Sequence, residues 1–204
     1  MKEKEITAYH EAGHALVASV LPYADPVHKI SIISRGRVAG YTLKLPLEER
    51  KLQSKNEFLD DIAVSLGGYV TERLIFSDIT TGSSNDLQVA TALARDMVTK
   101  YGMSEKMGPI ALEGMGGRPL FGSRGVEDHE YSEKVSGDID AEVARIMNEA
   151  YKRAEKIIVS RRDVLDVIAR QLIEVETLER NEFERIIIAH GIIPKKKQDI
   201  EHQI

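Results

Sequence analysis

The stretch His10-Glu11-Ala12-Gly13-His14, near the start of this 204-residue chain, decides both its fold class and its chemistry. On an α-helix, residues four positions apart lie on one face, so both imidazoles can reach the same metal ion. Glu11 lies at the margin of that face, within reach of a water molecule on the metal. Two neutral imidazoles suit Zn²⁺, which lowers the pKa of such a water to about 7. The spacing therefore predicts a zinc site on a helix, with a carboxylate placed to accept a proton.

The residues around this motif favour a partly buried helix over the solvated edge of an ordinary one. Apolar residues recur at helical spacing and form one stripe, which comprises Ile6, Tyr9, Gly13, Leu16, Val17 and Val20. The two histidines flank this stripe, where imidazoles without partners would cost stability. Gly13 costs about 1 kcal/mol relative to Ala inside a helix, which makes sense if another backbone passes close to it. Leu21-Pro22 then ends the helix.

The composition restricts the ligands and the partners. The chain has no Cys, so disulfides are excluded and any metal must be held by His and carboxylate side chains. Its net charge of -5 argues against nucleic acid as the main partner. The sequence holds no apolar run of about 18 residues, so it predicts no membrane span.

Hydrophobic periodicity predicts a mainly α-helical domain with one small β-sheet, an α+β fold that carries the zinc motif on its first helix. Two short strands are expected, at His28 to Ser34 and at Val38 to Leu45. A helix capped by Ser54-x-x-Glu57 is expected to continue through Leu74, with Gly67-Gly68 packed against the Gly13 face. Further helices are expected to begin near 85 and to cover 139–157, 164–172 and the region after 181, with a long loop over 108–128.

A third protein ligand has to come from outside the motif. The extended H-E-x-x-H-x-x-G-x-x-H form is absent, because Val17 and Val20 occupy its Gly and His positions. The candidate carboxylates are Glu72, Asp78 and Asp86. Glu72 lies on the second helix, as in zinc proteases whose third ligand is a Glu on a following helix. Asp86 begins the third helix, where the free N–H groups of the first turn also favour an acid. Spacing alone leaves Glu72 and Asp86 open.

Short motifs in separate parts of the chain follow one another in a recognisable order. They are Tyr9-His10-Glu11-Ala12-Gly13-His14-Ala15, His28-Lys29-Ile30-Ser31-Ile32-Ile33 with Arg35-Gly36, Gly40-Tyr41-Thr42-Leu43, Leu66-Gly67-Gly68 with Glu72, Thr80-Thr81-Gly82-Ser83-Ser84-Asn85-Asp86-Leu87, Ala94-Arg95-Asp96-Met97-Val98 and Tyr101-Gly102-Met103-Ser104. In these motifs, from about residue 2 to 193, the chain resembles the peptidase domain of the FtsH family, membrane-anchored and ATP-dependent AAA+ zinc proteases. One departure is Leu120-Phe121-Gly122, where the family has Phe-Leu-Gly in a mobile loop.

The resemblance implies the ligand set and the role of each residue. The family's third zinc ligand is the Asp of an Asn-Asp pair after a Thr-Gly turn, which corresponds to Asp86. Glu72 then becomes a carboxylate that supports the site from behind, or the alternative ligand. The resemblance thus implies one Zn²⁺ per subunit on His10, His14 and Asp86, with Glu11 as the base of a zinc-dependent endopeptidase.

The resemblance also implies parts that this sequence does not contain. The family carries a G-x-x-x-x-G-K-[ST] phosphate loop and a membrane span upstream, and neither is present here. We therefore expect an excised peptidase domain over residues 1–193 with a solvated tail over 194–204, soluble as a fragment. ATP would act only through an AAA+ ATPase domain of the full-length chain. The parent protein would be a homo-hexamer in the inner membrane, with this domain on the cytoplasmic side, degrading unfolded or membrane proteins.

Substrate is expected at the small sheet. A peptide added as a strand to a sheet edge is held by backbone hydrogen bonds, which do not depend on its side chains. The candidate edge lies near His28 to Ser34 or near Gly40 to Leu43. The residues expected to contact substrate are Ile30, Ser31, Ile32, Ile33, Gly40, Tyr41 and Thr42.

A non-catalytic helical oligomerisation module is the alternative function. The long helices from Ile139 to Ile188 carry enough apolar residues for subunit packing, although most of this apolar stripe is expected to form the domain's own core. An intact Glu11 favours the enzyme, because a purely structural zinc site needs no base and is closed by a fourth protein ligand.

Overall fold

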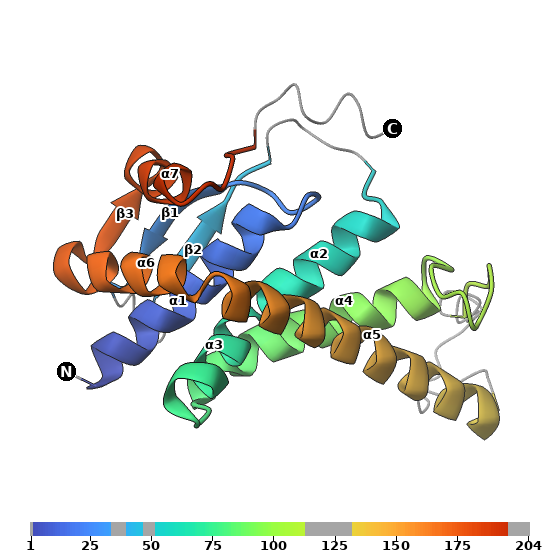
Figure 1. Ribbon diagram of the computed structural model, residues 1–204. Helices are drawn as coiled ribbons and strands as arrows, with labels where there is room; N and C mark the ends of the chain where they lie inside the picture. Colours follow the sequence, from blue (N-terminus) through green and yellow to red (C-terminus); the bar gives the residue numbers. More distant parts are fainter. Residues whose placement is uncertain (1, 34–39, 47–51, 113–131, 196–204) are drawn as a thin grey trace, which may run out of the picture.

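The structure is a computed structural model that describes residues 2–33, 40–46, 52–112 and 132–195. The helices are α1 (Lys2–Val20), α2 (Lys55–Ser65), α3 (Gly67–Phe76), α4 (Ser84–Thr99), α5 (Glu133–Ser160), α6 (Arg162–Val175) and α7 (Arg180–Ala189). The strands are β1 (Val27–Ser31), β2 (Tyr41–Lys44) and β3 (Thr177–Glu179), and the short 3₁₀ helix η1 (Thr81–Ser83) precedes α4. The predicted mainly α-helical fold with one small sheet is confirmed (Figure 1). None of the described helices is both long and apolar enough to cross a membrane.

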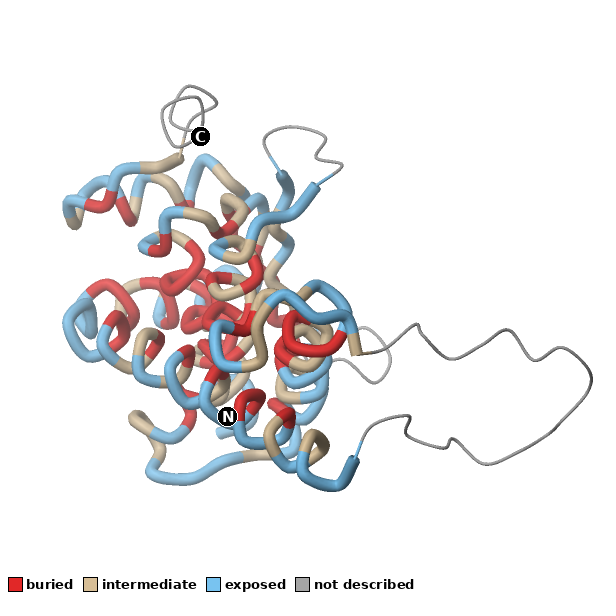
Figure 2. Tube along the Cα trace, turned by 90° about the vertical axis from the view of Figure 1, so that its right-hand side faces the viewer, coloured by how far each residue is buried: buried red, intermediate tan, exposed pale blue. Residues whose placement is uncertain are grey.

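The helix that carries the zinc motif, α1, is the central element of the fold. It packs against α3 and α6 and also contacts β1 and β2. Because it has neighbours on several sides, every residue from His10 to Ala18 is buried. The buried residues gather in the interior where these elements meet (Figure 2). The motif therefore lies inside the protein and not on a solvated helix edge.

Two glycines bring α1 and α3 into backbone contact. A Cβ added to Gly13 would lie 2.6 Å from the carbonyl oxygen of Gly67, and it would overlap the Thr71 hydroxyl. A Cβ added to Gly67 would lie 2.9 Å from the carbonyl oxygen of Gly13. Neither position has room for a side chain, so the predicted close packing of these two segments is confirmed.

The single helix expected from Ser54 to Leu74 is divided in the structure. The chain turns at Leu66, whose N–H donates to Ile62 O at 3.1 Å, and α3 begins at the next residue, Gly67. The turn allows α2 to pack against α4 while α3 packs against α1. Periodicity extends across the break, because both halves bury apolar residues, and so it does not reveal the change of direction.

The sheet has three antiparallel strands in the order β2-β1-β3, one strand more than predicted. Ile30 of β1 stands opposite Thr42 of β2 on one side and opposite Leu178 of β3 on the other. The third strand was not predicted because it is only three residues long, and its partner lies far away in the sequence. Among the described strands, β2 and β3 are therefore the outer ones and β1 is central.

The central position of β1 corrects part of the expected substrate site. Backbone groups of Ile30 and Ser31 pair with both neighbouring strands, and the N–H of Ile32 donates to Glu176 O at 3.0 Å. These residues have no free edge to offer to an added peptide. Ile33 follows the strand and is half exposed, and residues 34–39 lie outside the described part of the chain. Of the two edges considered, only β2 is available.

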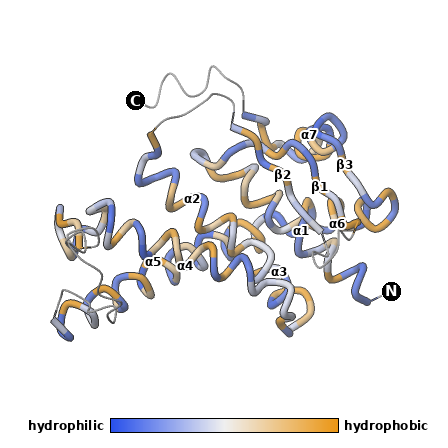
Figure 3. The backbone as a smooth tube through the Cα atoms, turned by 180° about the vertical axis from the view of Figure 1, so that it is seen from behind, coloured by the Kyte–Doolittle hydropathy of each residue, from blue (hydrophilic) through white to orange (hydrophobic). Residues whose placement is uncertain are grey.

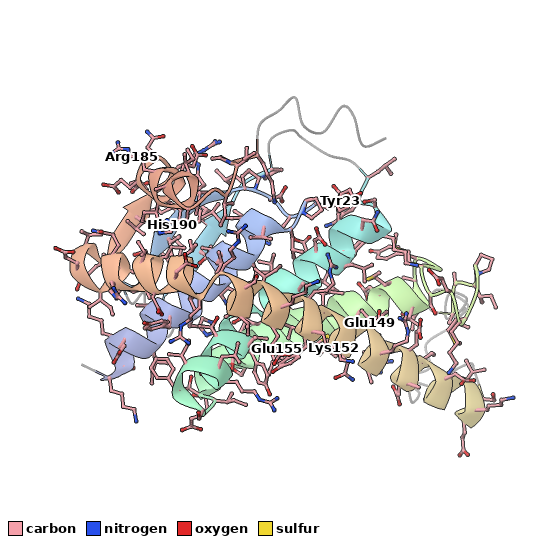
Figure 4. The ribbon with its side chains drawn as sticks, viewed as in Figure 1. Tyr23, Glu149, Lys152, Glu155, Arg185 and His190 are labelled. Carbon is pink, nitrogen blue, oxygen red and sulfur yellow. The ribbon has the colours of Figure 1, made fainter. Side chains whose placement is uncertain are left out.

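The long helix α5 uses its apolar stripe within this chain. The stripe is buried against α2, α3 and α4, and comprises Ile139, Val143, Ile146, Ala150, Ala154 and Ile157. Hydrophobic and hydrophilic residues alternate along the helix (Figure 3), and Glu149, Lys152 and Glu155 project from its charged side (Figure 4). This stripe is therefore part of the domain's own core, as expected for most of it.

The C-terminal segment is folded further than expected. Lys195 was assigned to a solvated tail, but its Nζ donates to Ala18 O at 2.7 Å and also to Ala24 O. Ala18 lies in the last turn of α1, where helix carbonyls lack partners within the helix, and Ala24 lies in the turn that follows α1. Lys195 therefore belongs to the domain. Residues 196–204, like residues 113–128 of the expected loop, lie outside the described residues.

Candidate metal centre and catalytic site

Three atoms that could bind one metal ion, from α1 and α4, converge on one point. His10 Nε2 lies 3.0 Å from His14 Nε2 and 3.1 Å from Asp86 Oδ2, and His14 Nε2 lies 3.3 Å from the same oxygen. A tetrahedral zinc ion with bonds of about 2.0–2.1 Å holds neighbouring ligand atoms about 3.3 Å apart. The three atoms therefore have the spacing of three ligands on one tetrahedral ion.

The hydrogen-bond partners of the two rings fix which nitrogens are free. His14 Nδ1 lies 2.7 Å from Val64 O, and because a carbonyl can only accept, this nitrogen carries the hydrogen. His10 Nδ1 lies 2.7 Å from the carboxylate oxygen Oε1 of Glu72, which accepts in the same way. Both neutral rings then direct unprotonated Nε2 atoms toward Asp86 Oδ2. Three converging lone pairs repel one another unless a cation joins them, so this donor set fits zinc.

The pKa values of His10 and Asp86 also indicate that this site favours a positive charge. Burial opposes a charge on His10, but hydrogen bonds to Asp86 and Glu72 outweigh it and raise the pKa of His10 to about 9. Burial also opposes the charge on Asp86, yet its close contacts with the two imidazoles hold the pKa of its carboxyl well below the usual range. A proton on His10 therefore satisfies the site when no metal is bound, and a metal ion has to displace that proton.

Glu72 lies behind the His10 ring and not among the ligand atoms. Its Oε1 accepts from His10 Nδ1, and its Oε2 accepts from the Thr80 N–H at 2.7 Å. Burial raises the pKa of Glu72, but the hydrogen bonds from His10 and Thr80 outweigh burial and lower it. Thr80 starts the turn that leads through η1 to Asp86. One ionised carboxylate thus orients both a histidine ring and the turn that leads to Asp86 on α4.

Asp78 lies away from the ligand atoms, whereas Gly68 lies directly against the His10 ring. Asp78, the remaining candidate, is exposed and accepts from the N–H of Ile79, so it takes no part in the cluster. Gly68 has a role that the sequence did not indicate. A Cβ added there would lie 2.5 Å from His10 Nδ1, so the missing side chain makes the space for the ring. The Gly67-Gly68 pair was visible in the sequence, but it was interpreted only as a site of close helix packing.

The carboxylate of Glu11 lies beside the ligand set and against β2. Its Oε2 accepts from the Thr42 hydroxyl at 2.7 Å, and a Cβ added to Gly40 would lie 2.9 Å from its Oε1. Glu11 is buried, and its negative charge contributes to the raised pKa of His10. The carboxylate is therefore close enough to act on the ligand set electrostatically without belonging to it.

A buried H-E-x-x-H helix, a carboxylate from another helix in the position of the third ligand, and a separate carboxylate beside them are typical of the class of zinc metallopeptidases. Within this class, the model of peptidase family M41 matches residues 1–186, and the chain belongs to that family. The name of that family describes its members as peptidases.

The chain is also similar to proteins named FtsH, which supports the family assignment and confirms the expected resemblance. The chain is 46% identical over 191 residues to the ATP-dependent zinc metalloprotease FtsH of Rubrobacter xylanophilus, covering 94% of this chain and 29% of that protein. It is 44% identical over 196 residues to the protein of the same name from Bacillus subtilis, covering 96% of this chain and 31% of the relative. The ATP-dependent zinc metalloprotease FtsH 1 of a Thermoanaerobacter species is 47% identical over 94% of this chain and 31% of its own length. The chain thus spans about three tenths of these relatives.

Proposed function

We propose that this chain is the proteolytic part of an ATP-dependent protease, with zinc on His10, His14 and Asp86 and with Glu11 as the catalytic base. The observation that carries the proposal is the triangle of ligand atoms, with edges of 3.0, 3.1 and 3.3 Å, beside the carboxylate of the same motif. The test of this function is whether the chain cleaves an unfolded protein and whether that cleavage requires zinc.

The protein side chains divide the chemistry among them. When bound, zinc supplies a Lewis acid that activates water and polarises the substrate carbonyl. Glu11 accepts a proton as water attacks and delivers it to the departing nitrogen. Glu72 and the carbonyl of Val64 keep a hydrogen on Nδ1 of His10 and His14, so that Nε2 of each ring stays available for the metal.

We propose further that substrate adds as a strand to the outer edge of β2. The N–H of Leu45 donates to Pro26 O on the β1 side at 3.2 Å. Backbone groups alternate in direction along an antiparallel strand, so those of Lys44 and Thr42 face away from β1. Within the described ranges no other strand pairs with this edge. Because Thr42 also contacts Glu11, a peptide bound there passes the base. Backbone pairing would accept unfolded polypeptides of varied sequence.

Lys44→Pro tests this edge, because it removes one outward N–H without requiring a change in the strand. We expect kcat/KM for an unfolded substrate to fall about five- to tenfold, the effect of about one lost hydrogen bond. Lys44→Ala is the matched control, since it removes the ion pair of Lys44 with Asp61 (3.1 Å) but keeps the N–H. Equal cleavage by the two variants, at equal zinc content, would show that substrate is held elsewhere.

We propose that the parent chain supplies the parts named by the family. These are an AAA+ ATPase domain that feeds unfolded or membrane proteins to the site, and a transmembrane segment in the inner membrane that leaves this domain on the cytoplasmic side. The support is that the relatives are named ATP-dependent and that this chain matches only about three tenths of their length. The coding sequence upstream should contain a G-x-x-x-x-G-K-[ST] motif and an apolar segment of about 20 residues. Its lack of both would contradict this arrangement.

We also propose a homo-hexamer, for which the support is family membership alone. Since the apolar stripe of α5 is used within the chain, we expect contacts between copies of this chain to be weak. Light scattering over a concentration series should show hexamers growing out of smaller species. A strictly monomeric chain at high micromolar concentration would contradict assembly through this domain.

A further inference from the structure

We propose that Thr42 is a positioning residue that holds the Glu11 carboxylate in place for proton transfer. Its hydroxyl oxygen lies 2.7 Å from Glu11 Oε2 and 3.3 Å from the main-chain oxygen of the same residue. The nearer carboxylate oxygen takes the hydroxyl hydrogen, which makes this a short bond to a charged acceptor. The inference rests on the proposed function, in which Glu11 is the base, and adds to it the group that orients that base.

The register of the sheet aims the Thr42 hydroxyl at α1. Thr42 stands directly opposite Ile30, and opposite residues of neighbouring strands project from the same face of the sheet. Ile30 is fully buried, and β1 packs on α1, so this face is the inner one. A shift of the register by one residue would turn Thr42 away from α1. Thr is also branched at Cβ, which restricts χ1 and so limits the directions in which the hydroxyl can point.

Gly40 supports the other oxygen of the same carboxylate. It precedes Thr42 by two residues and so lies on the same side of the chain. A Cβ at this position would approach Glu11 Oε1 and Thr7 Cγ2, each to 2.9 Å. One oxygen of Glu11 is therefore held by the Thr42 hydroxyl, while the other fits in the space that Gly40 leaves open. This fixes a side chain that otherwise has three rotatable bonds.

The arrangement gives β2 two tasks at once. Its outer edge offers backbone groups to substrate, and its inner face holds the base that acts on the scissile bond. Placing both on one rigid strand keeps the distance between base and peptide constant while different sequences pass. Small displacements of a reacting group cost large factors in rate, so loss of the Thr42 hydroxyl should act on the chemical step.

Thr42→Val tests the inference because it removes the hydroxyl, keeps the shape and leaves the backbone edge intact. We expect kcat to fall about tenfold or more, with KM within about twofold of the original value and with unchanged zinc content. Thr42→Ser, which retains the hydroxyl, should restore kcat to within about threefold. An unchanged kcat in Thr42→Val would overturn the inference. A rise in KM alone would also overturn it, because the Thr42 side chain would then be a substrate contact. A folded Thr42→Ser variant whose kcat stays as low as that of Thr42→Val would overturn it as well.

Glu11→Gln, measured beside these variants, separates the inference from the proposed function. Cleavage by Glu11→Gln at the original rate would overturn the assignment of the base, whatever the Thr42 variants show. An inactive Glu11→Gln together with a fully active Thr42→Val would overturn only the positioning role. Slow turnover in Thr42→Val, inactivity in Glu11→Gln and recovery in Thr42→Ser together would support both.

Discussion

Glu11→Gln should lower the rate of proteolysis by at least about 10²-fold and leave zinc binding and folding intact. The amide has nearly the shape of the carboxylate but cannot accept the proton. Its oxygen can still accept the Thr42 hydrogen, which occupies Oε2 at 2.7 Å in the native site, so the buried contact survives. The ligand atoms of His10, His14 and Asp86 are untouched by the change. The measurement is hydrolysis of labelled casein, together with elemental zinc analysis and a thermal unfolding curve.

A control on the same helix makes this result interpretable. Glu5→Gln changes an exposed acid in the first turn of α1 and should leave the rate and the zinc content unchanged. If Glu11→Gln cleaves as fast as Glu5→Gln, then Glu11 takes no part in the reaction. If Glu11→Gln loses its zinc, then Glu11 is a ligand and not the base.

Asp86→Ala should weaken zinc binding more than any change behind the ligands. The variant removes one of three ligand atoms and leaves two imidazole nitrogens 3.0 Å apart with no carboxylate to share the cation. We expect a loss of affinity greater than about 10²-fold, with activity lost in parallel. Glu72→Ala removes a group behind the ligands, which orients His10 and the turn at Thr80, and such partners typically contribute about 10- to 100-fold in affinity. Competition with a coloured zinc chelator measures both.

The order of these two variants decides between the candidate ligands. Asp78→Ala is the matched control, because this exposed carboxylate lies in the same stretch of chain and should change nothing. If Glu72→Ala loses zinc and activity while Asp86→Ala retains both, the ligand set proposed here is wrong.

The zinc helix could be predicted because its signals are local. The spacing of His10 and His14 follows from the helical repeat, and the unfavourable Gly13 indicated the close approach of a second backbone, which Gly67 provides. The capping box at Ser54 is likewise local, and its reciprocal bonds with Glu57 are present at 2.6 and 3.3 Å. Such features depend on residues within a few positions of one another, so one sequence is enough to find them.

The third metal ligand could not be chosen from spacing, and the structure shows why Glu72 and Asp86 were hard to tell apart. Glu72 and Asp86 bind opposite nitrogens of the same His10 ring, at 2.7 Å on Nδ1 and 3.1 Å on Nε2. Both are therefore near the site, and only the orientation of the ring separates a ligand from a supporting group. The partner of His14 Nδ1, a main-chain carbonyl at Val64, has no side-chain signature at all.

The edge of the sheet depends on contacts that are distant in sequence. β3 occupies one side of β1 and leaves β2 outermost, and nothing in the short run Thr177–Glu179 indicates this pairing. The contact between Thr42 and Glu11 follows from the same register and spans 31 positions. For this reason the sequence could suggest strand addition but could not say which strand provides the edge.

Hydrolysis of unfolded casein by this chain, with and without a zinc chelator, tests the central claim most directly. We expect cleavage to stop when zinc is removed and to resume when about one equivalent is returned. Identically purified Glu11→Gln should stay inactive in every condition, which excludes a contaminating protease. Cleavage that continues in zinc-free protein, or that Glu11→Gln shares, would contradict the assignment of His10, His14, Asp86 and Glu11 to a zinc-dependent active site.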